Sequence, residues 1–115
     1  MQLPTDSFLL RIFLGESDRH NGNPLYENIV LKAREAGLAG ATVLRGAMGF
    51  GASSRLHTSK ILRLSADLPL IIEIVDTEEK INAFVPTLES MMGGGLVTLE
   101  KVRVIRYRHG GQPAK

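Results

Sequence analysis

Residues 69–75 read PLIIEIV, a run that predicts a β-strand with apolar side chains on both of its faces. Because side chains alternate along a strand, one face holds Leu70, Ile72 and Ile74. The other face holds Ile71 and Val75, separated by Glu73. Both faces of the predicted strand therefore need cover.

A second strand with the same property is predicted at residues 8–14, FLLRIFL. Its second face carries Leu9 and Phe13. The face that a half-exposed antiparallel sheet normally turns to water is thus largely apolar in both strands. The simplest cover is another copy of the chain, so the sequence predicts a symmetric oligomer.

Two amphipathic helices are predicted between the strands. The first has Asn23 as its N-cap and Pro24 at its first position, and it ends at Gly37. Its apolar stripe consists of Leu25, Tyr26, Ile29, Val30 and Ala33. The second follows Asp76 and Glu79, which have the spacing of a capping box, and its apolar residues are Ile81, Phe84, Val85, Leu88 and Met91.

The order of these elements predicts the fold. Further strands are expected at residues 41–44 and 96–108, which gives the order strand, helix, strand, strand, helix, strand. Two right-handed halves place both helices on the same face of one antiparallel sheet, as in the ferredoxin-like α+β sandwich. The 115 residues are expected to form one domain, 1–115, with a core at about residues 8–108 and flexible ends.

Composition narrows the classes of function. The chain has no cysteine, which excludes disulfides and thiolate chemistry and fits a reducing compartment. No stretch approaches the roughly 18 apolar residues of a membrane span, and the start lacks a signal-peptide pattern, so we expect a cytoplasmic protein. With 4 Phe and 2 Tyr, most of them at packing positions, the sheet lacks aromatic residues for stacking on bases, and we expect no nucleic-acid partner.

No nucleophile elbow, P-loop, zinc spacing or dinucleotide fingerprint occurs, so no catalytic residue is predicted and the chain is not expected to be an enzyme. One cluster keeps an alternative open, because Glu16, Asp18 and His20 have the chemistry to bind a metal ion or transfer a proton. The competing interpretation is that Asp18, Asn21 and Asn23 are turn and capping residues. A small metal-binding protein or enzyme that uses residues 15–23 is therefore one alternative, and a purely structural assembly subunit is another.

The connection between the two middle strands, residues 47–68, is longer than a hairpin needs and is the first functional candidate. It opens with Gly49, Phe50 and Gly51, where glycines let backbone N–H groups approach a ligand. It contains no acidic residue between positions 47 and 66, and its candidate partner-docking residues are Arg55, His57, Lys60 and Arg63. We expect a mobile loop that docks on an acidic or phosphate-bearing surface.

Four runs of the sequence resemble a known family: LGE at residues 14–16, NPLYE at 23–27, RGAMGFG at 45–51 and LSADLPLIIEIVD at 64–76. They are similar to the PII-like domain-of-unknown-function family one hundred and ninety, over about residues 9–108. The ending RVIRYR, residues 103–108, further resembles the nitrogen regulatory PII proteins and, more distantly, the CutA trimers. The resemblance implies a homotrimer with small effectors in the clefts between subunits and long loops that reach a transporter, channel or enzyme.

In PII proteins those effectors are adenine nucleotides, and the resemblance implies phosphate-binding positions at Gly93, Gly94, Gly95, Arg106 and Arg108. Two arginines two positions apart on a strand point to one side, which suits a phosphate group beside the glycine amides. The chain departs from PII proteins in three places: the glycine run lacks a lysine, Ala52 follows the GFG run, and the long loop has no tyrosine. The resemblance therefore does not extend to binding of 2-oxoglutarate with magnesium and ATP, and a different anionic effector remains open.

Overall fold

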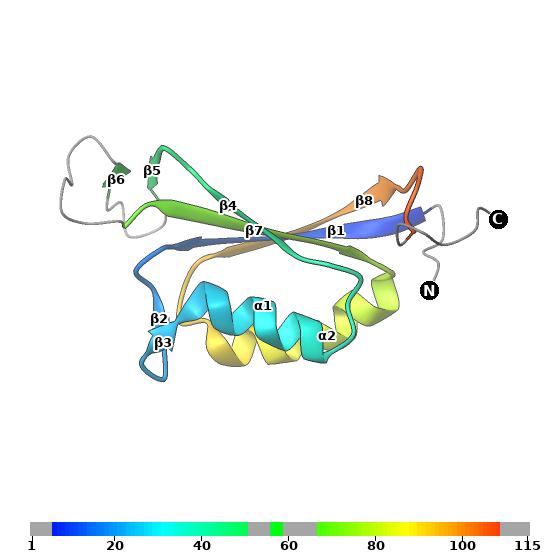
Figure 1. Cartoon of the computed structure of the whole chain (residues 1–115), viewed down its shortest axis with the longest axis horizontal. Helices are drawn as coiled ribbons and strands as arrows, with labels where there is room; N and C mark the ends of the chain where they lie inside the picture. The colour runs from blue at the N-terminus through cyan, green and yellow to red at the C-terminus, as the bar shows by residue number, and fades with distance from the viewer. Residues whose placement is uncertain (1–5, 51–55, 59–66, 109–115) are drawn as a thin grey trace.

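The computed structural model describes residues 6–50, 56–58 and 67–108, and its centre is a four-stranded antiparallel sheet in the order β4-β7-β1-β8. Two helices cover one face of this sheet (Figure 1). The elements of this layer pair are β1 (Asp6–Gly15), α1 (Leu25–Glu35), β4 (Thr42–Arg45), β7 (Pro69–Asp76), α2 (Glu78–Met91) and β8 (Leu96–Arg103). The predicted ferredoxin-like α+β fold is confirmed. Neither helix is long and apolar enough to cross a membrane, among the residues described.

Two short hairpins are added to this sheet. In the first, β2 (Arg19–His20) pairs with β3 (Asn23–Pro24) across Asn21 and Gly22. Both turn residues have positive φ, at 52° and 82°, as the tight two-residue turn of a twisted hairpin requires. In the second hairpin β5 (Met48–Phe50) pairs with β6 (Leu56–Thr58), and the sequence did not predict either strand.

The core lies between the sheet and the helices. Ile12 of β1 stands opposite Ile72 of β7, and both side chains are fully buried. The even-numbered residues of these two strands face the helices, and they meet the helix residues Leu25, Ile29, Ala33, Ile81, Phe84, Leu88 and Met91. This cluster contains every residue of the predicted stripe of α2, with Val85 partly buried, and every residue of the predicted stripe of α1 except Val30, with Tyr26 partly buried.

The opposite side of the sheet, the open face, has no helix over it (Figure 1). The strand register places one apolar residue from each of the four strands in a single row, namely Leu44, Ile71, Phe13 and Leu96. Leu44 is 45% exposed and Leu96 is 56% exposed. This face carries the apolar residues that the two central strands predicted, and this row of the face is partly exposed in the single chain.

The start of α1 differs from the predicted one. Its N-cap is Pro24 rather than Asn23, and no side chain caps the first turn. The backbone carbonyl of Asp18 instead accepts a hydrogen bond from the N–H of Leu25 at 2.8 Å. A backbone carbonyl of the preceding loop therefore replaces the side-chain cap, and a backbone acceptor cannot be recognised from the residue type.

The end of α1 follows the prediction. Gly37 has a φ of 77°, its N–H donates to the carbonyl of Arg34 at 3.1 Å, and the N–H of Leu38 donates to that of Ala33 at 3.1 Å. This pair of bonds is the Schellman motif, in which glycine adopts the left-handed conformation just after the helix.

The start of α2 lies one residue later than the predicted capping box. Thr77 is the N-cap, and its hydroxyl accepts a hydrogen bond from the N–H of Lys80 at 3.1 Å. Asp76 is fully buried and accepts hydrogen bonds from Thr77 N at 2.6 Å and from Ala39 N at 2.8 Å. Asp76 thus joins the end of β7 to the loop after α1, and Glu79 is an exposed residue of the first turn.

The last strand is shorter than predicted, because β8 ends at Arg103 and not at residue 108. Arg103 pairs with Asp6, the first residue of β1 that the structure describes, and the chain then turns toward the loop before β4, where Tyr107 bonds to Ala39. Residues 104–108 leave the sheet. The predicted flexible ends lie outside the described residues.

The buried carboxylate of Asp76 generates a stability prediction. We expect Asp76→Asn to lower the free energy of unfolding by about 1.5–3 kcal/mol, because the amide group replaces one acceptor of a backbone N–H with a donor. Urea denaturation measures this difference. Glu79→Gln is the matched control and should change stability by less than about 1 kcal/mol. Equal stability of Asp76→Asn and the wild type would show that these two bonds do not hold the junction.

Candidate functional site

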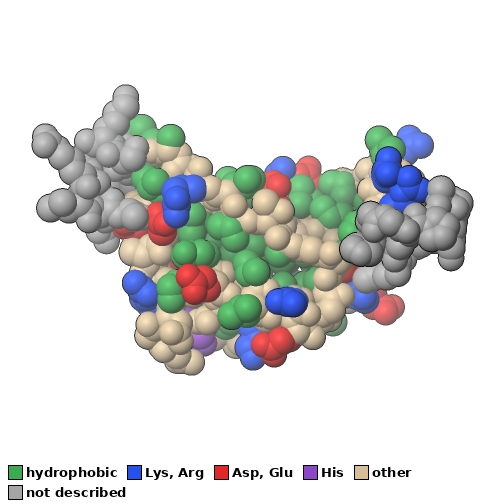
Figure 2. All heavy atoms as spheres, in the orientation of Figure 1, with side chains coloured by type: hydrophobic (Ala, Val, Ile, Leu, Met, Phe, Trp, Pro, Cys, Tyr) green, Lys and Arg blue, Asp and Glu red, His purple; other side chains and the backbone are tan. Residues whose placement is uncertain are grey.

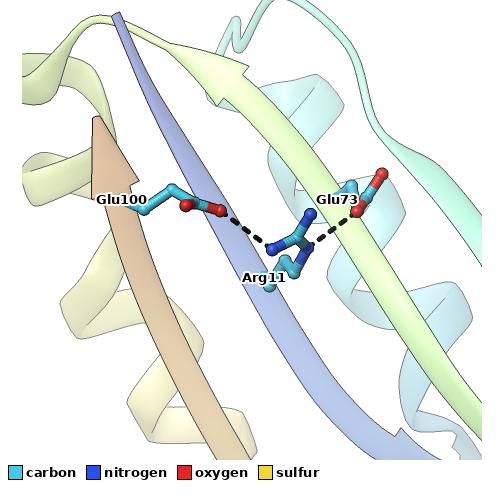
Figure 3. A network of polar contacts seen from close by, with 3 residues as sticks. All are labelled: Arg11, Glu73 and Glu100. Carbon is cyan, nitrogen blue, oxygen red and sulfur yellow. Dashed lines mark hydrogen bonds and ion pairs between the residues drawn. The ribbon is translucent and has the colours of Figure 1, made fainter. Parts of the chain in front are cut away.

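Three charged side chains meet at the centre of the open face (Figure 3). Arg11 of β1 donates from Nε to Oε2 of Glu73 on β7 at 2.8 Å, and from Nη1 to Oε1 of Glu100 on β8 at 2.9 Å. Arg11 and Glu73 are directly opposite in the register. Glu100 lies two residues along β8 from Thr98, the residue opposite Arg11, and is itself opposite Leu9. One guanidinium thus links three neighbouring strands.

The two carboxylates stabilise the charged form of the guanidinium. The hydrogen bond that Arg11 donates to Glu73 is the main cause that raises the pKa of Arg11 above its ordinary value, and Glu100 adds to it. Arg11 therefore stays positively charged at every accessible pH. With two carboxylates and one cation, this group has a net negative charge, and its neighbours on the open face include Thr42 and Thr98 as well as apolar residues.

A hollow of about 700 Å³ opens on the same face, beside this group. It is lined by Leu9 and Arg11 of β1, Glu73 and Val75 of β7, residues 39–42 at the start of β4, and residues 102–107 at the end of β8. We call it the open-face hollow. Figure 2 shows Lys and Arg side chains gathered at the end of the molecule where the chain leaves β8.

The predicted phosphate-binding residues fall into two separate places in one chain. Gly93, Gly94 and Gly95 precede β8, whereas Arg106 and Arg108 follow it. The strand has 8 residues, which at about 3.3 Å each separates its ends by about 25 Å. Arg106 lines the open-face hollow, and the glycine run does not. One chain therefore does not bring the two groups together, and residues 106 and 108 are not in a strand that would align them.

The predicted ligand loop is described in part. Gly49 and Phe50 belong to β5, and Phe50 is 72% exposed. A Cβ at Gly49 would lie 3.4 Å from Cγ of Pro69, so this glycine permits close packing of β5 on β7. Of the predicted docking residues, His57 lies in β6. Gly51, Arg55, Lys60 and Arg63, and most of the segment expected to be mobile, lie outside the described residues.

Both ends of this long connection are held by the loop that follows β1. Arg45, the last residue of β4, forms an ion pair with Glu16. On the returning side, Asp67 accepts a hydrogen bond from Ser17 N at 3.2 Å, and the carbonyl of Leu68 accepts one from Glu16 N at 2.8 Å. We call residues 45–46 and 67–69 the loop roots. The carbonyl of Pro69 joins them directly by accepting from Gly46 N at 2.7 Å.

The candidate metal ligands have structural partners. Asp18 accepts a hydrogen bond from Gly15 N at 2.9 Å, and Glu16 pairs with Arg45. The carbonyl of His20 accepts from Nδ2 of Asn28 at 3.1 Å. Over residues 6–50, 56–58 and 67–108, no three His, Asp or Glu side chains are grouped as metal ligands. The side chains of Glu16 and Asp18 thus bond to other parts of the chain, Arg45 and the backbone of Gly15.

Sequence reasoning missed the charged group at the centre of the open face. Arg11 and Glu73 each interrupt a run of apolar residues, and Glu100 lies beside Lys101 in β8, but these positions predict no contact until the register is known. Tyr107 was missed as well, and its hydroxyl donates to the carbonyl of Ala39 at 2.8 Å. No local pattern connects residues that are this far apart in the chain.

The fold is similar to that of PII-like proteins. It matches the structure of CPII, a nitrogen regulatory PII-like protein from Thiomonas intermedia K12 bound to ADP, AMP and bicarbonate, with a TM-score of 0.61 and 20% identity. The match covers 88% of this chain and 90% of that one. The apo form of CPII matches with a TM-score of 0.50 and 19% identity, over 86% of this chain and 91% of that one.

The sequence then identifies the family. Residues 7–104 match the model of the family DUF190, described as an uncharacterised ACR. The chain is 43% identical over 99 residues to a UPF0166 protein of Aquifex aeolicus, a match that covers 84% of this chain and 91% of that protein. A UPF0166 protein of Methanocaldococcus jannaschii is 37% identical, with 85% and 91% covered. The chain belongs to the DUF190 family, as the sequence runs indicated.

The backbone conformation of the glycine run before β8 generates a stability prediction. Gly95 has a φ of +107°, and a Cβ there would lie 2.8 Å from the carbonyl oxygen of Phe13. We expect Gly95→Ala to lower the free energy of unfolding by at least about 1 kcal/mol, measured by thermal or urea denaturation.

Gly94→Ala is the control, because a Cβ at Gly94 meets nothing within 4 Å. Its stability should stay within about 0.5 kcal/mol of the wild type. If Gly95→Ala proved as stable as Gly94→Ala, the backbone constraint on Gly95 would be refuted.

Proposed function

We propose that this chain is a PII-like regulatory protein and not an enzyme, and that it binds a small anionic effector of the adenine nucleotide type. The observation that carries this proposal is the open-face hollow. Its lining includes the apolar residues Leu9 and Val75 and, beyond the end of β8, Arg106. Apolar surface suits a base, and forked guanidinium donors suit a phosphate group.

The proposed assembly is a homotrimer in which copies pack through the open face. The apolar row across the four strands is uncovered, and burying such a row against another copy removes it from water. The hollow lies on this same face, so a neighbouring copy would add a further wall to it. Only a neighbouring copy can bring a glycine run to Arg106, because about 25 Å of β8 separates them within one chain.

Ligand-bound relatives in fold support the choice of effector. CPII was solved with ADP, AMP and bicarbonate, at 20% identity to this chain. The glycine run of this chain, residues 93–95, has no lysine beside it, which removes one cation for a third phosphate. We propose ADP and AMP as the nucleotides to test first, with ATP as the comparison.

The proposed output is a contact made by the long loop with a transporter, a channel or an enzyme. Residues 47–66 carry basic side chains and no acidic ones, which suits a partner surface that is acidic or phosphate-bearing. We propose that the protein acts in the cytoplasm. The chain has no cysteine and so does not need an oxidising compartment to form disulfides.

Arg106 supplies the direct test of the effector site. We expect Arg106→Ala to weaken binding of ADP or AMP by about tenfold or more, because a charge-assisted hydrogen bond contributes about 1.5–3 kcal/mol and each 1.4 kcal/mol is a factor of ten. Titration calorimetry of both proteins measures the affinity. The control is Arg34→Ala, which removes an exposed arginine from the last turn of α1. Absence of binding of ADP, AMP and ATP to the wild type would refute the effector part of the proposal.

The trimer is tested with two leucines of equal exposure. Leu96 on the open face is 56% exposed and Leu31 on α1 is 55% exposed. Light scattering should give the wild type about three times the 12.6 kDa mass of one chain. We expect Leu96→Glu to lower this mass, because a carboxylate would be buried without a partner, and Leu31→Glu to leave it unchanged. A monomeric wild type at micromolar concentration would rule out a site shared between copies.

A further inference from the structure

After β8 ends, the chain crosses the open face instead of continuing along the sheet edge. We call residues 104–108 the strap. β8 is one edge of the sheet and β4 is the other, three strand spacings or roughly 14 Å away. The hydroxyl of Tyr107 nevertheless donates to the carbonyl of Ala39, just before β4, at 2.8 Å. The strap therefore reaches from one edge of the sheet to the other.

The open face lies beneath the strap. Leu9, Arg11, Glu73, Val75 and Thr42 all belong to the set that the register places on this face, and all line the same hollow as residues 104–107. One wall of the hollow is therefore a segment outside regular structure, and the others are strands and the α1–β4 loop. The size of the opening depends on where this segment is held.

The strap is held lightly. Ile105 is 93% exposed, so its side chain buries little apolar area, whereas Tyr107 is 41% exposed and contributes most of the contact. A segment with few buried apolar contacts opens at low free energy. The hydrogen bond from the Tyr107 hydroxyl to the carbonyl of Ala39 ties the strap to the far edge of the sheet.

We propose that Tyr107 is a positioning residue for the anionic effector. Its bond to Ala39 closes the strap over the hollow and keeps Arg106, the preceding residue, on the rim. An anion that engages Arg106 favours the closed strap, and the tether at Tyr107 favours binding of the anion, since the two effects are reciprocal. This inference rests on the proposed effector site, but the tether itself exists in the free protein.

Tyr107→Phe tests the tether without a ligand, because it removes the hydroxyl and keeps the ring. In the full-length free protein we expect amide hydrogen exchange of residues 104–108 to become about fivefold faster, the effect of losing one hydrogen bond of typical net strength. The control is Tyr26→Phe, the same change at the other tyrosine of the chain, on α1. It should leave exchange in the strap unchanged. Equal exchange in Tyr107→Phe and the wild type would overturn the tether.

The second arm tests the positioning role with ADP as the probe. We expect Tyr107→Phe to weaken ADP binding several-fold in calorimetry, while Tyr26→Phe binds as the wild type does. The double variant Tyr107→Phe with Arg106→Ala should bind no more weakly than Arg106→Ala alone, because Tyr107 acts through Arg106. Additive losses would overturn this route, and faster exchange with unchanged ADP affinity would overturn the positioning role.

The two arms separate this inference from the proposed function. If the wild type binds no adenine nucleotide, the effector proposal fails and with it the positioning role, whereas the exchange measurement still decides whether the strap is tethered. If the wild type binds ADP and only the Tyr107 results are negative, the effector site stands and this inference alone is refuted.

Discussion

The pairing of β1 with both β7 and β8 is the constraint on which the rest of the structure depends. Because side chains alternate, a shift of one residue in either ladder would exchange the core face for the open face. The observed register puts Ile12 opposite Ile72 under the helices. It also puts Arg11 opposite Glu73 on the other face. A register shifted by one residue would place Arg11 opposite Ile72 or Ile74 and would lose this ion pair.

The sequence indicated the sheet and helices because periodicity reports burial, and burial is a local property of an element. It misjudged the boundaries where a distant partner decides. β8 ends at Arg103 as the chain turns toward Ala39, to which Tyr107 is bonded. α1 begins at Leu25, where Asp18 supplies the capping carbonyl, and Asp76 is bonded to Ala39 instead of starting α2. In each case the deciding atom belongs to another element.

The candidate site divides in the same way. Arg106 was found through the resemblance of the sequence ending, and it does line the hollow. Its companions were not found, because Leu9, Glu73 and the residues before β4 come together only through the sheet order. The expected neighbours of Arg106, the glycines 93–95, lie at the other end of β8. The length of β8 keeps the two groups apart, and a sequence motif does not report the distance between its residues in the fold.

The loop roots have a consequence for how this fold changes over time. Hydrogen bonds tie Gly46 to Pro69 and Glu16 to Leu68, so the two points where the long connection leaves and re-enters the sheet are fixed next to each other. Closing a longer connection between fixed points adds only about 0.6 kcal/mol for each doubling of its length. Insertions, deletions and new recognition sequences can therefore accumulate between the roots at little expense to folding, and one scaffold can acquire new partners while its core stays the same.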